Sequence, residues 1–216
     1  MNLHNFIVLF GLCKAPPAKF PKSAQEWIKY LKGLQMNVGG FFFNPLEIKH
    51  CLLRAALNIP KIYQANKDLT YPKYNEGDER LSFVYNKKNA LINFGFSYPF
   101  KSSPRIKVYT YDKIYEQLKH TASFYLSKCK LEKSKTQLQL PGVIEMYEKD
   151  FIDTNEGLVN YIRTLLPSEM AEGYKKLFDS WYMLNGNKVV RRLYMRRSIM
   201  NSCSIIHLNE LLSISL

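Results

Sequence analysis

The sequence predicts an α+β fold in which a small antiparallel sheet packs against several helices. Some segments repeat apolar residues every three or four positions, as helices with one buried face do, and others are short apolar runs bounded by turn residues, as strands are. The 216 residues are 46% hydrophobic and 14% aromatic, which is enough for a core of ordinary size without disulfides. One main domain is therefore expected.

The amino-terminal third contains clear local signals. The apolar run FIVLFGL, residues 6–12, predicts a buried first helix, because it is far too short to span a bilayer and no basic residue precedes it as in a signal peptide. No transmembrane segment is expected. Ser23 and Glu26 have the spacing of a capping box and predict the start of a second helix. Its apolar face would comprise Trp27, Tyr30, Leu31 and Leu34.

The middle of the chain mixes turn, helix and strand signals. Gly39-Gly40 marks a turn beside the run FFF, and apolar spacing predicts a helix over residues 46–57, before Pro60. Residues 61–80 are polar and predict a surface loop. Three strands are then predicted: LSFVY (81–85), ALINF (90–94) and the alternating segment around Ile106 and Val108.

Helices dominate the last predicted elements. Asp112 is placed to cap a helix that ends near Lys128, and QLQLP (137–141) predicts a short strand or extended segment. Two further helices are predicted over residues 142–151 and 156–166. The apolar residues of the helix after Asp112 are Ile114, Tyr115, Leu118, Ala122, Tyr125 and Leu126.

The net charge of +13 favours anionic partners such as nucleic acid, an anionic surface or an acidic protein. Two clusters carry much of it: Lys128, Lys130, Lys133 and Lys135, and near the carboxyl end Lys188, Arg191, Arg192, Arg196 and Arg197. A run of charges is usually a solvated face, and no nucleic-acid-binding motif accompanies either cluster. Binding of nucleic acid or an anionic surface through the second cluster is therefore an alternative hypothesis.

The cysteines and histidines indicate neither a metal site nor a cofactor. No cysteine belongs to a CxxC pair, and no histidine has a spacing such as HExxH. Scattered single cysteines are typical of free thiols in a reducing compartment, so we expect a cytoplasmic location. The residues are Cys13, Cys51, Cys129 and Cys203, and His4, His50, His120 and His207.

Four blocks of the chain together resemble the family called domain of unknown function 547. They are NVGGFFFNPLEIKHCLLRAAL, NKKNALINFG, SSPRIKVYTYDKIYEQLKHTASFYL and QLPGVIEMYEKDF. In that family a Gly-Gly turn precedes a helix with the pattern Ile-Glu-His-Gly-Ile-Leu-Arg. The chain matches it at Ile48, His50, Leu52, Leu53 and Arg54, and departs from it at Lys49 and Cys51.

The resemblance implies a fold of the broad papain and transglutaminase class, in which a cysteine and a histidine could act together. The family's histidine falls on Asn89, and its two cysteines fall on Phe94 and Ser103. Asn cannot accept a proton and Phe carries no nucleophile, so cysteine-type chemistry is not expected. The resemblance therefore implies a non-catalytic binding or scaffold domain, that is, a pseudoenzyme.

Candidate site residues follow from the same blocks. The alternative to a pseudoenzyme is a hydrolase or acyl transferase in which His50 activates Ser103 or a cysteine. Polar residues of the matching loop could also bind a ligand without reacting, although turn and capping roles are the more common explanation of such residues. The ligand-pocket candidates are Arg54, Asn89, Asn93, Gly95, Ser102 and Ser103.

The resemblance also suggests the domain limits. It covers residues 1–185 and ends on FDSWYMLN, which leaves a basic carboxyl-terminal extension over residues 186–216. Residues 1–7, MNLHNFI, resemble the family pattern Ile-Asn-Leu-Tyr-Asn-Ala-Leu, so the family's upstream helices are expected to be missing. In related chains the domain accompanies leucine-zipper, glutaredoxin-like or DEP modules, which implies a protein partner.

Overall fold

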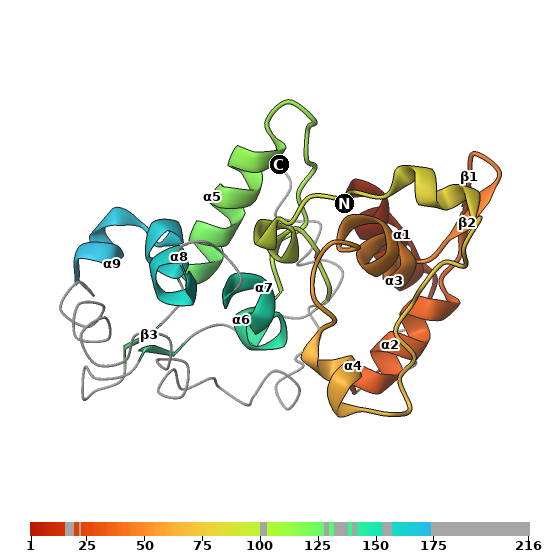
Figure 1. Cartoon of the computed structure of the whole chain (residues 1–216), viewed down its shortest axis with the longest axis horizontal. Coiled ribbons are helices and arrows are strands. Elements are labelled where there is room, and N and C mark those ends of the chain that lie inside the picture. The colour runs from red at the N-terminus through yellow and green to blue at the C-terminus, as the bar shows by residue number, and fades with distance from the viewer. Residues whose placement is uncertain are drawn as a thin grey trace.

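The computed structural model describes most of the first 173 residues. The described ranges are 1–15, 20–21, 23–99, 103–127, 130–131, 138–139, 142–152 and 157–173. Helices predominate in them, and each of the two small sheets is an antiparallel pair of strands. Figure 1 shows α1 to α4 with β1 and β2 in one half of the molecule, and α5, α8 and α9 in the other, with α6 and α7 between them. The expected α+β class with a small antiparallel sheet is confirmed.

Helix α1, Asn2–Lys14, buries one side against the rest of the chain. His4, Asn5, Ile7, Val8 and Leu12 are buried, so the predicted apolar helix is correct in place and also carries two buried polar residues. The opposite side is not buried, because Phe6 is 53% and Phe10 45% exposed. Among the described residues, no helix combines the length and the apolar character needed to cross a membrane.

The second helix and the first hairpin begin as predicted. In α2, Ala24–Gly33, the Ser23 hydroxyl accepts a hydrogen bond of 3.2 Å from the Glu26 N–H. Strands β1, Met36–Val38, and β2, Phe41–Phe43, pair antiparallel with Met36 opposite Phe43. The turn between them places Gly39 and Gly40 at φ of 61° and 91°, a region that favours glycine.

The helix predicted over residues 46–57 is shorter and of a different kind. It begins as α3, Pro45–Glu47, with a capping box between Asn44 and Glu47 that the sequence reading did not identify. It continues as a π-helix, η2, Ile48–Leu53, and the Arg54 N–H donates to the Lys49 carbonyl over 2.9 Å. The wider turn of a π-helix brings more neighbouring side chains onto its inner side than an α-helix does.

Two of the predicted strands are short 3₁₀ helices, η3, Glu79–Phe83, and η4, Ala90–Phe94. In each of these helices, the side chain of the preceding residue caps the first turn. The Asp78 carboxylate accepts a hydrogen bond from the Arg80 N–H, and the Asn89 side-chain oxygen accepts one from the Leu91 N–H. All five residues of η4 are buried, so its apolar run reflects burial on every side rather than the face of a strand.

Three further expectations need correction. The polar segment 61–80 is not only a loop, because α4, Lys61–Ala65, lies in it and Tyr63 is buried. Residues 104–110 form no strand; instead the Tyr109 N–H and carbonyl both bond to the Asn2 side chain. Helix α5, Ile114–Leu126, is capped at Lys113 without a side-chain bond, so the predicted Asp112 cap is wrong.

The remaining elements are short. The predicted helix 142–151 is divided at Tyr147 into α6, Gly142–Met146, and α7, Glu148–Ile152. Helix α8, Gly157–Leu165, lies within the predicted range 156–166, and α9 follows. The element bounds not yet given are β3, Lys130–Leu131, β4, Leu138–Gln139, and α9, Ser168–Gly173.

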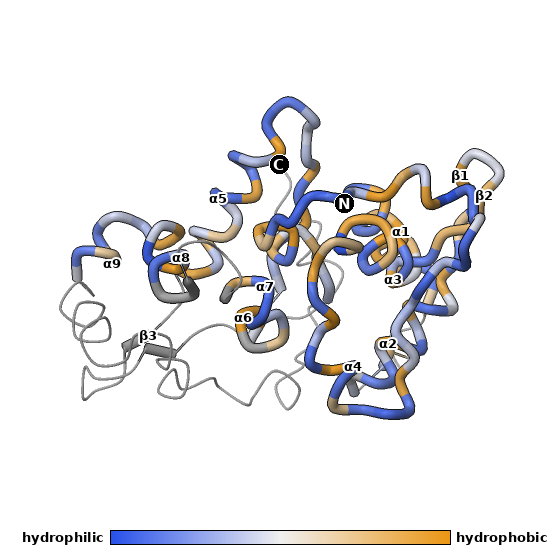
Figure 2. The backbone as a smooth tube through the Cα atoms, viewed as in Figure 1, coloured by the Kyte–Doolittle hydropathy of each residue, from blue (hydrophilic) through white to orange (hydrophobic). Residues whose placement is uncertain are grey.

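The largest core cluster joins η4 and α5 to α6, α7 and α8. Phe94, Ala122, Leu126, Ile144 and Phe151 have no exposed surface in it. Hydrophobic and hydrophilic residues alternate around the turns of α5 and α8, as expected of helices with one buried face (Figure 2). Two smaller clusters lie around α1, one with α2 and one with β2 and η2.

Candidate functional site

A buried polar cluster lies where η2 meets the segment after η4 and the junction of α6 and α7. Lys49, His50, Arg54, Asn93 and Asp150 are all at most 5% exposed. Lysine, arginine and aspartate are almost never fully buried unless they are paired. This cluster is therefore where the chain departs most from an ordinary core, and we take it as the first candidate site.

Arg54 is the centre of the cluster and is wholly buried. Its Nη2 forms an ion pair with the Asp150 carboxylate and donates to the Asn58 carbonyl at 3.1 Å, and its Nε donates to the Asn93 side-chain oxygen at 2.7 Å. Asp150 also accepts from the Asn93 Nδ2 at 2.9 Å and from the Asn58 N–H at 2.9 Å. Arg54 and Asn93, both predicted to contact a ligand, thus serve mainly in an internal network.

Lys49 is also buried, and its neighbours are mainly aromatic rings. Its Nζ donates to the Tyr98 hydroxyl over 2.9 Å and lies 4.7 to 5.1 Å from the ring centres of Phe96, Tyr98 and Tyr147. Burial, and to a lesser degree the Arg54 charge, hold the pKa of Lys49 well below its ordinary value. Aromatic faces attract an ammonium group, but they do not replace a carboxylate as its counter-charge.

A chain of hydrogen bonds continues from Lys49 to α1. The Tyr98 hydroxyl lies 3.3 Å from His4 Nε2, and His4 Nδ1 lies 3.0 Å from the Asn5 side-chain oxygen. Since that oxygen can only accept, these partners place the His4 proton on Nδ1. Burial, with a smaller contribution from Lys49, lowers the pKa of His4 to about 3, so the ring is neutral at pH 7.

His50 is buried among aromatic rings. The centres of the Tyr63 and Tyr71 rings lie 5.3 and 5.1 Å from the His50 ring. Burial first, and then the charges of Lys49 and Arg54, keep the pKa of His50 well below its ordinary value. Within the described residues, His50 Nδ1 has no hydrogen-bond partner, so His50 is not paired with Ser103 or Cys51 as the hydrolase hypothesis requires.

The positions mapped to a histidine and two cysteines in the family have structural roles in this chain. The Asn89 side chain caps η4, and Phe94 is fully buried in the core. The Ser103 hydroxyl accepts from the Tyr98 N–H at 2.7 Å and closes the loop there. Cys51 is buried, and burial raises the pKa of its thiol to about 12, which leaves almost no thiolate at pH 7.

The other predicted residues are not brought together into one pocket. Gly95 is buried, its carbonyl accepts from the Asn5 side chain, and a Cβ there would collide with Met1 and approach a Leu118 methyl group at 3.0 Å. Ser102 lies outside the described residues. So do the basic candidates Lys188, Arg191, Arg192, Arg196 and Arg197.

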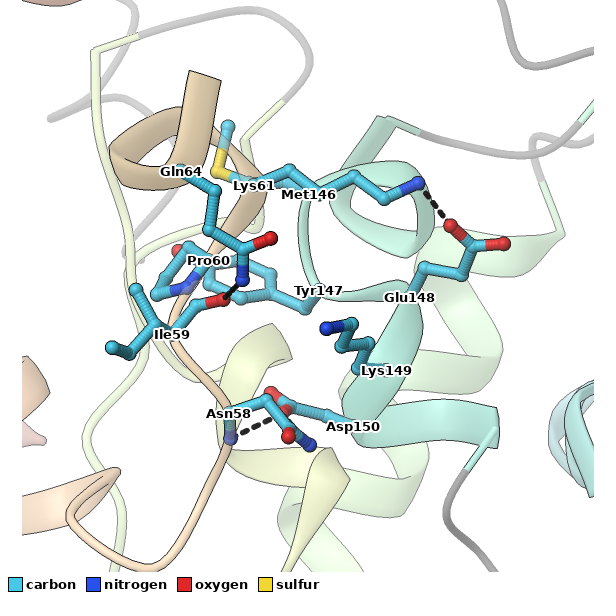
Figure 3. Close-up of a pocket in the computed structure, with 10 residues that line it drawn as sticks. All are labelled: Asn58, Ile59, Pro60, Lys61, Gln64, Met146, Tyr147, Glu148, Lys149 and Asp150. Atoms are coloured by element: carbon cyan, nitrogen blue, oxygen red, sulfur yellow. Dashed lines mark hydrogen bonds and ion pairs between the residues drawn. The ribbon is translucent and has the colours of Figure 1, made fainter. Parts of the chain in front are cut away.

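A small pocket adjoins the polar cluster (Figure 3). Its empty space is about 190 Å³ including the open side, and Asn58, Tyr147 and Asp150 line it as well as belonging to the cluster. Figure 3 shows the Lys61 side chain reaching across to Glu148, with which it forms an ion pair. None of the predicted ligand residues lines this pocket, since all its lining residues lie in 58–64 and 146–150.

A larger groove lies between α1, α2 and β1. Its empty space is about 600 Å³ including the open side, and the side chains of Ile7, Phe10, Leu34 and Met36 make it mainly apolar. Among the described residues, Lys14 is the one charged residue that lines it, and the Lys14 ammonium lies 5.5 Å from the Phe10 ring centre. The groove combines exposed aromatic area with a single positive charge.

Sequence reasoning missed both the polar cluster and the groove. The available signal for the cluster was the presence of polar residues inside apolar helical runs, namely His4 and Asn5 before FIVLFGL and Lys49 beside Ile48. Nothing local could pair Arg54 with Asp150. The described residues contain no group of three or more histidine, cysteine or acidic side chains placed to hold a metal ion.

A comparison with family models matches residues 1–126 to the model described as "Protein of unknown function, DUF547". No curated protein and no solved structure matches the chain. The matched range contains the whole groove between α1, α2 and β1, and all of η2. Asp150, which neutralises Arg54, lies beyond it.

Proposed function

The chain belongs to the family described as "Protein of unknown function, DUF547", and we propose that it is a non-catalytic domain that binds a segment of another protein. The observation that carries the proposal is the apolar groove between α1, α2 and β1, with Phe6 and Phe10 exposed on α1. Phe6 and Phe10 stack with their ring centres 6.2 Å apart. Exposed aromatic area beside a concave apolar surface is typical of sites that bind protein segments.

The charge of the chain indicates which kind of segment fits. The net charge is +13, and in the described part of the chain Lys14 is the only charged side chain along the groove. An acidic side chain of the partner could pair with Lys14 while apolar side chains fill the space over Ile7, Leu34 and Met36. We therefore commit to a partner segment that combines apolar anchors with acidic flanking residues.

The residues at the expected catalytic positions lack the pairing that catalysis needs, which supports binding rather than catalysis. Ser103 is engaged with the Tyr98 backbone, Asn89 caps a turn, and His50 makes no bond to a described nucleophile. The Cys51 thiol, which is next to His50 in sequence, is buried and has its pKa raised to about 12. A nucleophile of this kind needs an adjacent base or a lowered pKa.

The test is a titration of the purified chain with short fluorescein-labelled peptides, followed by fluorescence anisotropy. One peptide carries two leucines flanked by glutamates, and its matched control carries lysines in place of the glutamates. We expect the glutamate peptide to bind more tightly, Phe10→Ala to weaken its binding about tenfold, and Lys14→Glu to reverse the preference between the peptides. Tyr115→Ala, at a residue 61% exposed on α5, is the matched aromatic control and should change nothing.

Two outcomes of this titration would refute the proposal. The first is equal affinity for both peptides, because it would mean that charge at Lys14 plays no part. The second is unchanged binding in Phe10→Ala, because the peptide would then bind somewhere else. Circular dichroism of each variant shows that the fold is retained, which is expected because Phe10 and Lys14 lie on the exposed side of α1.

The hydrolase alternative can be tested directly by chemical labelling. Electrophilic serine and cysteine probes, with adducts located by mass spectrometry, should give no selective labelling of Ser103. Selective labelling that His50→Ala abolishes would favour the enzyme.

The alternative of nucleic-acid binding rests on Arg192 and its neighbours, and it predicts an affinity that falls steeply as salt is raised.

Two finer points, the fold class and the location, belong to the same proposal. The cysteine-peptidase-like outline is supported by the resemblance of the blocks around His50 and Ser103, and an experimental structure compared with that class would test it. A reducing, cytoplasmic location is supported by the free thiols of Cys13 and Cys51. Fractionation of cells with an antibody to the chain would test the location.

A further inference from the structure

A second site can be inferred from polar atoms that the buried cluster leaves unsatisfied. Among the described residues, His50 Nδ1, the Tyr63 hydroxyl and Arg54 Nη1 are enclosed and make no hydrogen bond. The Tyr71 hydroxyl is placed to accept a hydrogen bond from the Arg54 side chain, but Nη1 itself is left without a partner. Native interiors leave few such atoms, and several in one place usually indicate a missing water or ion.

The three groups belong to one neighbourhood. His50 lies on the π-helix η2, and Arg54, four residues later, directly follows its carboxyl end; both are buried. The Tyr63 ring packs edge-on against the His50 ring with the centres 5.3 Å apart. The positive charge of Arg54 acts on both His50 and Tyr63.

The chemistry of these groups distinguishes an anion from a water molecule. A guanidinium N–H can only donate, a phenol usually donates, and a neutral imidazole donates from whichever nitrogen holds its proton. A water molecule accepts two hydrogen bonds, whereas the oxygens of a carboxylate or nitrate accept several. Three donors in one neighbourhood are therefore better satisfied by an anion with more than one lone-pair-bearing atom.

The charges of the surroundings point the same way. The cationic groups of the cluster are Arg54 and Lys49, whereas Asp150 is the only carboxylate that bonds to either of them within the described residues. Asp150 already uses both oxygens, on Arg54, Asn58 and Asn93. Asp150 thus balances Arg54, and an anion nearby would favour the ammonium form of Lys49, whose pKa burial holds well below its ordinary value.

We propose that His50, Arg54 and Tyr63 bind a small anion of the carboxylate or nitrate class inside the domain. The site is separate from the groove on α1, and it goes beyond the proposed binding of a protein segment. The pocket of Figure 3 lies beside it, because Tyr147 and Asp150 line that pocket and also contact Arg54.

The test compares anions on the full-length chain. Thermal unfolding is followed with increasing sodium formate or sodium nitrate, and with sodium gluconate at equal ionic strength as the anion too large for the site. Formate and nitrate should raise the unfolding midpoint in a saturable manner, since a ligand that binds only the folded state stabilises it, and gluconate should not. Crystals soaked in sodium nitrate should show planar density for the anion within hydrogen-bond distance of His50 Nδ1 and Arg54 Nη1.

One variant separates this site from a general salt effect. Tyr63→Phe removes a hydroxyl and keeps the ring, so the fold should be retained, and the apparent dissociation constant for formate should rise at least about tenfold. The control Tyr115→Phe should behave as the parent. Phe10→Ala should also keep the formate response, so failure of the groove proposal and failure of this one can be told apart.

The proposal would be overturned by equal shifts of the midpoint with formate and gluconate. It would also be overturned by unchanged formate affinity in Tyr63→Phe, or by high-resolution density that shows only a water molecule between the three groups in crystals soaked with nitrate.

Discussion

Arg54 and Asp150 form an ion pair in which both side chains are completely buried, although they are 96 positions apart in the chain. The pair links the π-helix η2 to α7, and Asn93 bonds to both members. Arg54 lies in the range matched by the family model and Asp150 lies beyond it. The matched residues therefore depend on α7 for the counter-charge of their most buried cation.

Removal of this counter-charge should destabilise the fold strongly. Asp150→Asn leaves the Arg54 charge buried without a carboxylate, so we expect the free energy of unfolding in urea to fall by about 3–5 kcal/mol. Glu148→Gln is the matched control, because its partner Lys61 has a side chain that is 46% exposed, and we expect a loss of at most about 1 kcal/mol. Equal losses in the two variants would contradict the assigned role of Asp150.

Asn5 should matter more than its position in a helix suggests. Its side chain donates to the Gly95 carbonyl and accepts from the Ser97 N–H, both at 3.0 Å and both buried. Asn5→Ala leaves these two backbone groups unpaired, so we expect a loss of about 2–4 kcal/mol in urea unfolding.

The control for Asn5 lies on the same helix. Asn2 makes the equivalent pair of bonds to the Tyr109 backbone, but Asn2 is exposed and water can replace it. Asn2→Ala should therefore cost about 1 kcal/mol or less. If Asn2→Ala proved as costly as Asn5→Ala, burial would not be the reason for the effect.

The stability of the chain should fall in mild acid, in part through His4. The folded-state pKa of His4 is lowered to about 3 from 6.5, so the unfolded chain binds a proton that the folded chain does not between these values. The His4 contribution is full above pH 6.5 and is lost as the pH falls toward 3. From pH 7 to pH 5 the loss from this group should be about 2 kcal/mol.

The measurement is urea unfolding of the parent and of His4→Gln at both pH values. The difference between pH 7 and pH 5 should be smaller in the variant, because the titrating ring is gone, while the acid sensitivity of other groups is common to both chains. An equal pH dependence in the two chains would show that His4 takes up its proton without unfolding.

The two thiols in the described part of the chain should differ in reactivity. Burial raises the pKa of Cys51 to about 12, and Cys13 is exposed. With iodoacetamide at pH 8 and mass spectrometry of each site, native Cys51 should remain unlabelled while Cys13 reacts. Unfolding in urea should speed labelling of Cys51 by about a thousandfold, as its thiolate fraction returns to that of a free cysteine. Rapid labelling of native Cys51 would revive the nucleophile hypothesis.

The elements that the sequence predicted correctly depend on neighbours in the chain. Ser23 and Glu26 define the start of α2 within a single turn, and Gly39-Gly40 defines the hairpin because few other residues adopt positive φ. The stripe from Leu118 to Leu126 is buried along α5 as its spacing indicated. Family membership could also be predicted, because it rests on several blocks rather than on one motif.

The incorrect elements depend on what surrounds a segment. The run ALINF is apolar enough for a strand, yet no strand pairs with it in the described chain, and burial on all sides with Asn89 as a cap makes it a 3₁₀ helix. In the same way, Ile106 and Val108 alternate like a strand but remain exposed, and Tyr109 bonds to Asn2 instead of to a sheet.

The sequence by itself determined the α+β class and the family. Only the tertiary structure decided where unusual chemistry is found. Arg54 was named as a candidate, but its partner Asp150 and the buried position of Lys49 could not be read from local pattern. The physical reason is that burial and charge pairing depend on contacts between residues far apart in the chain, whereas helix starts and turns depend on adjacent ones.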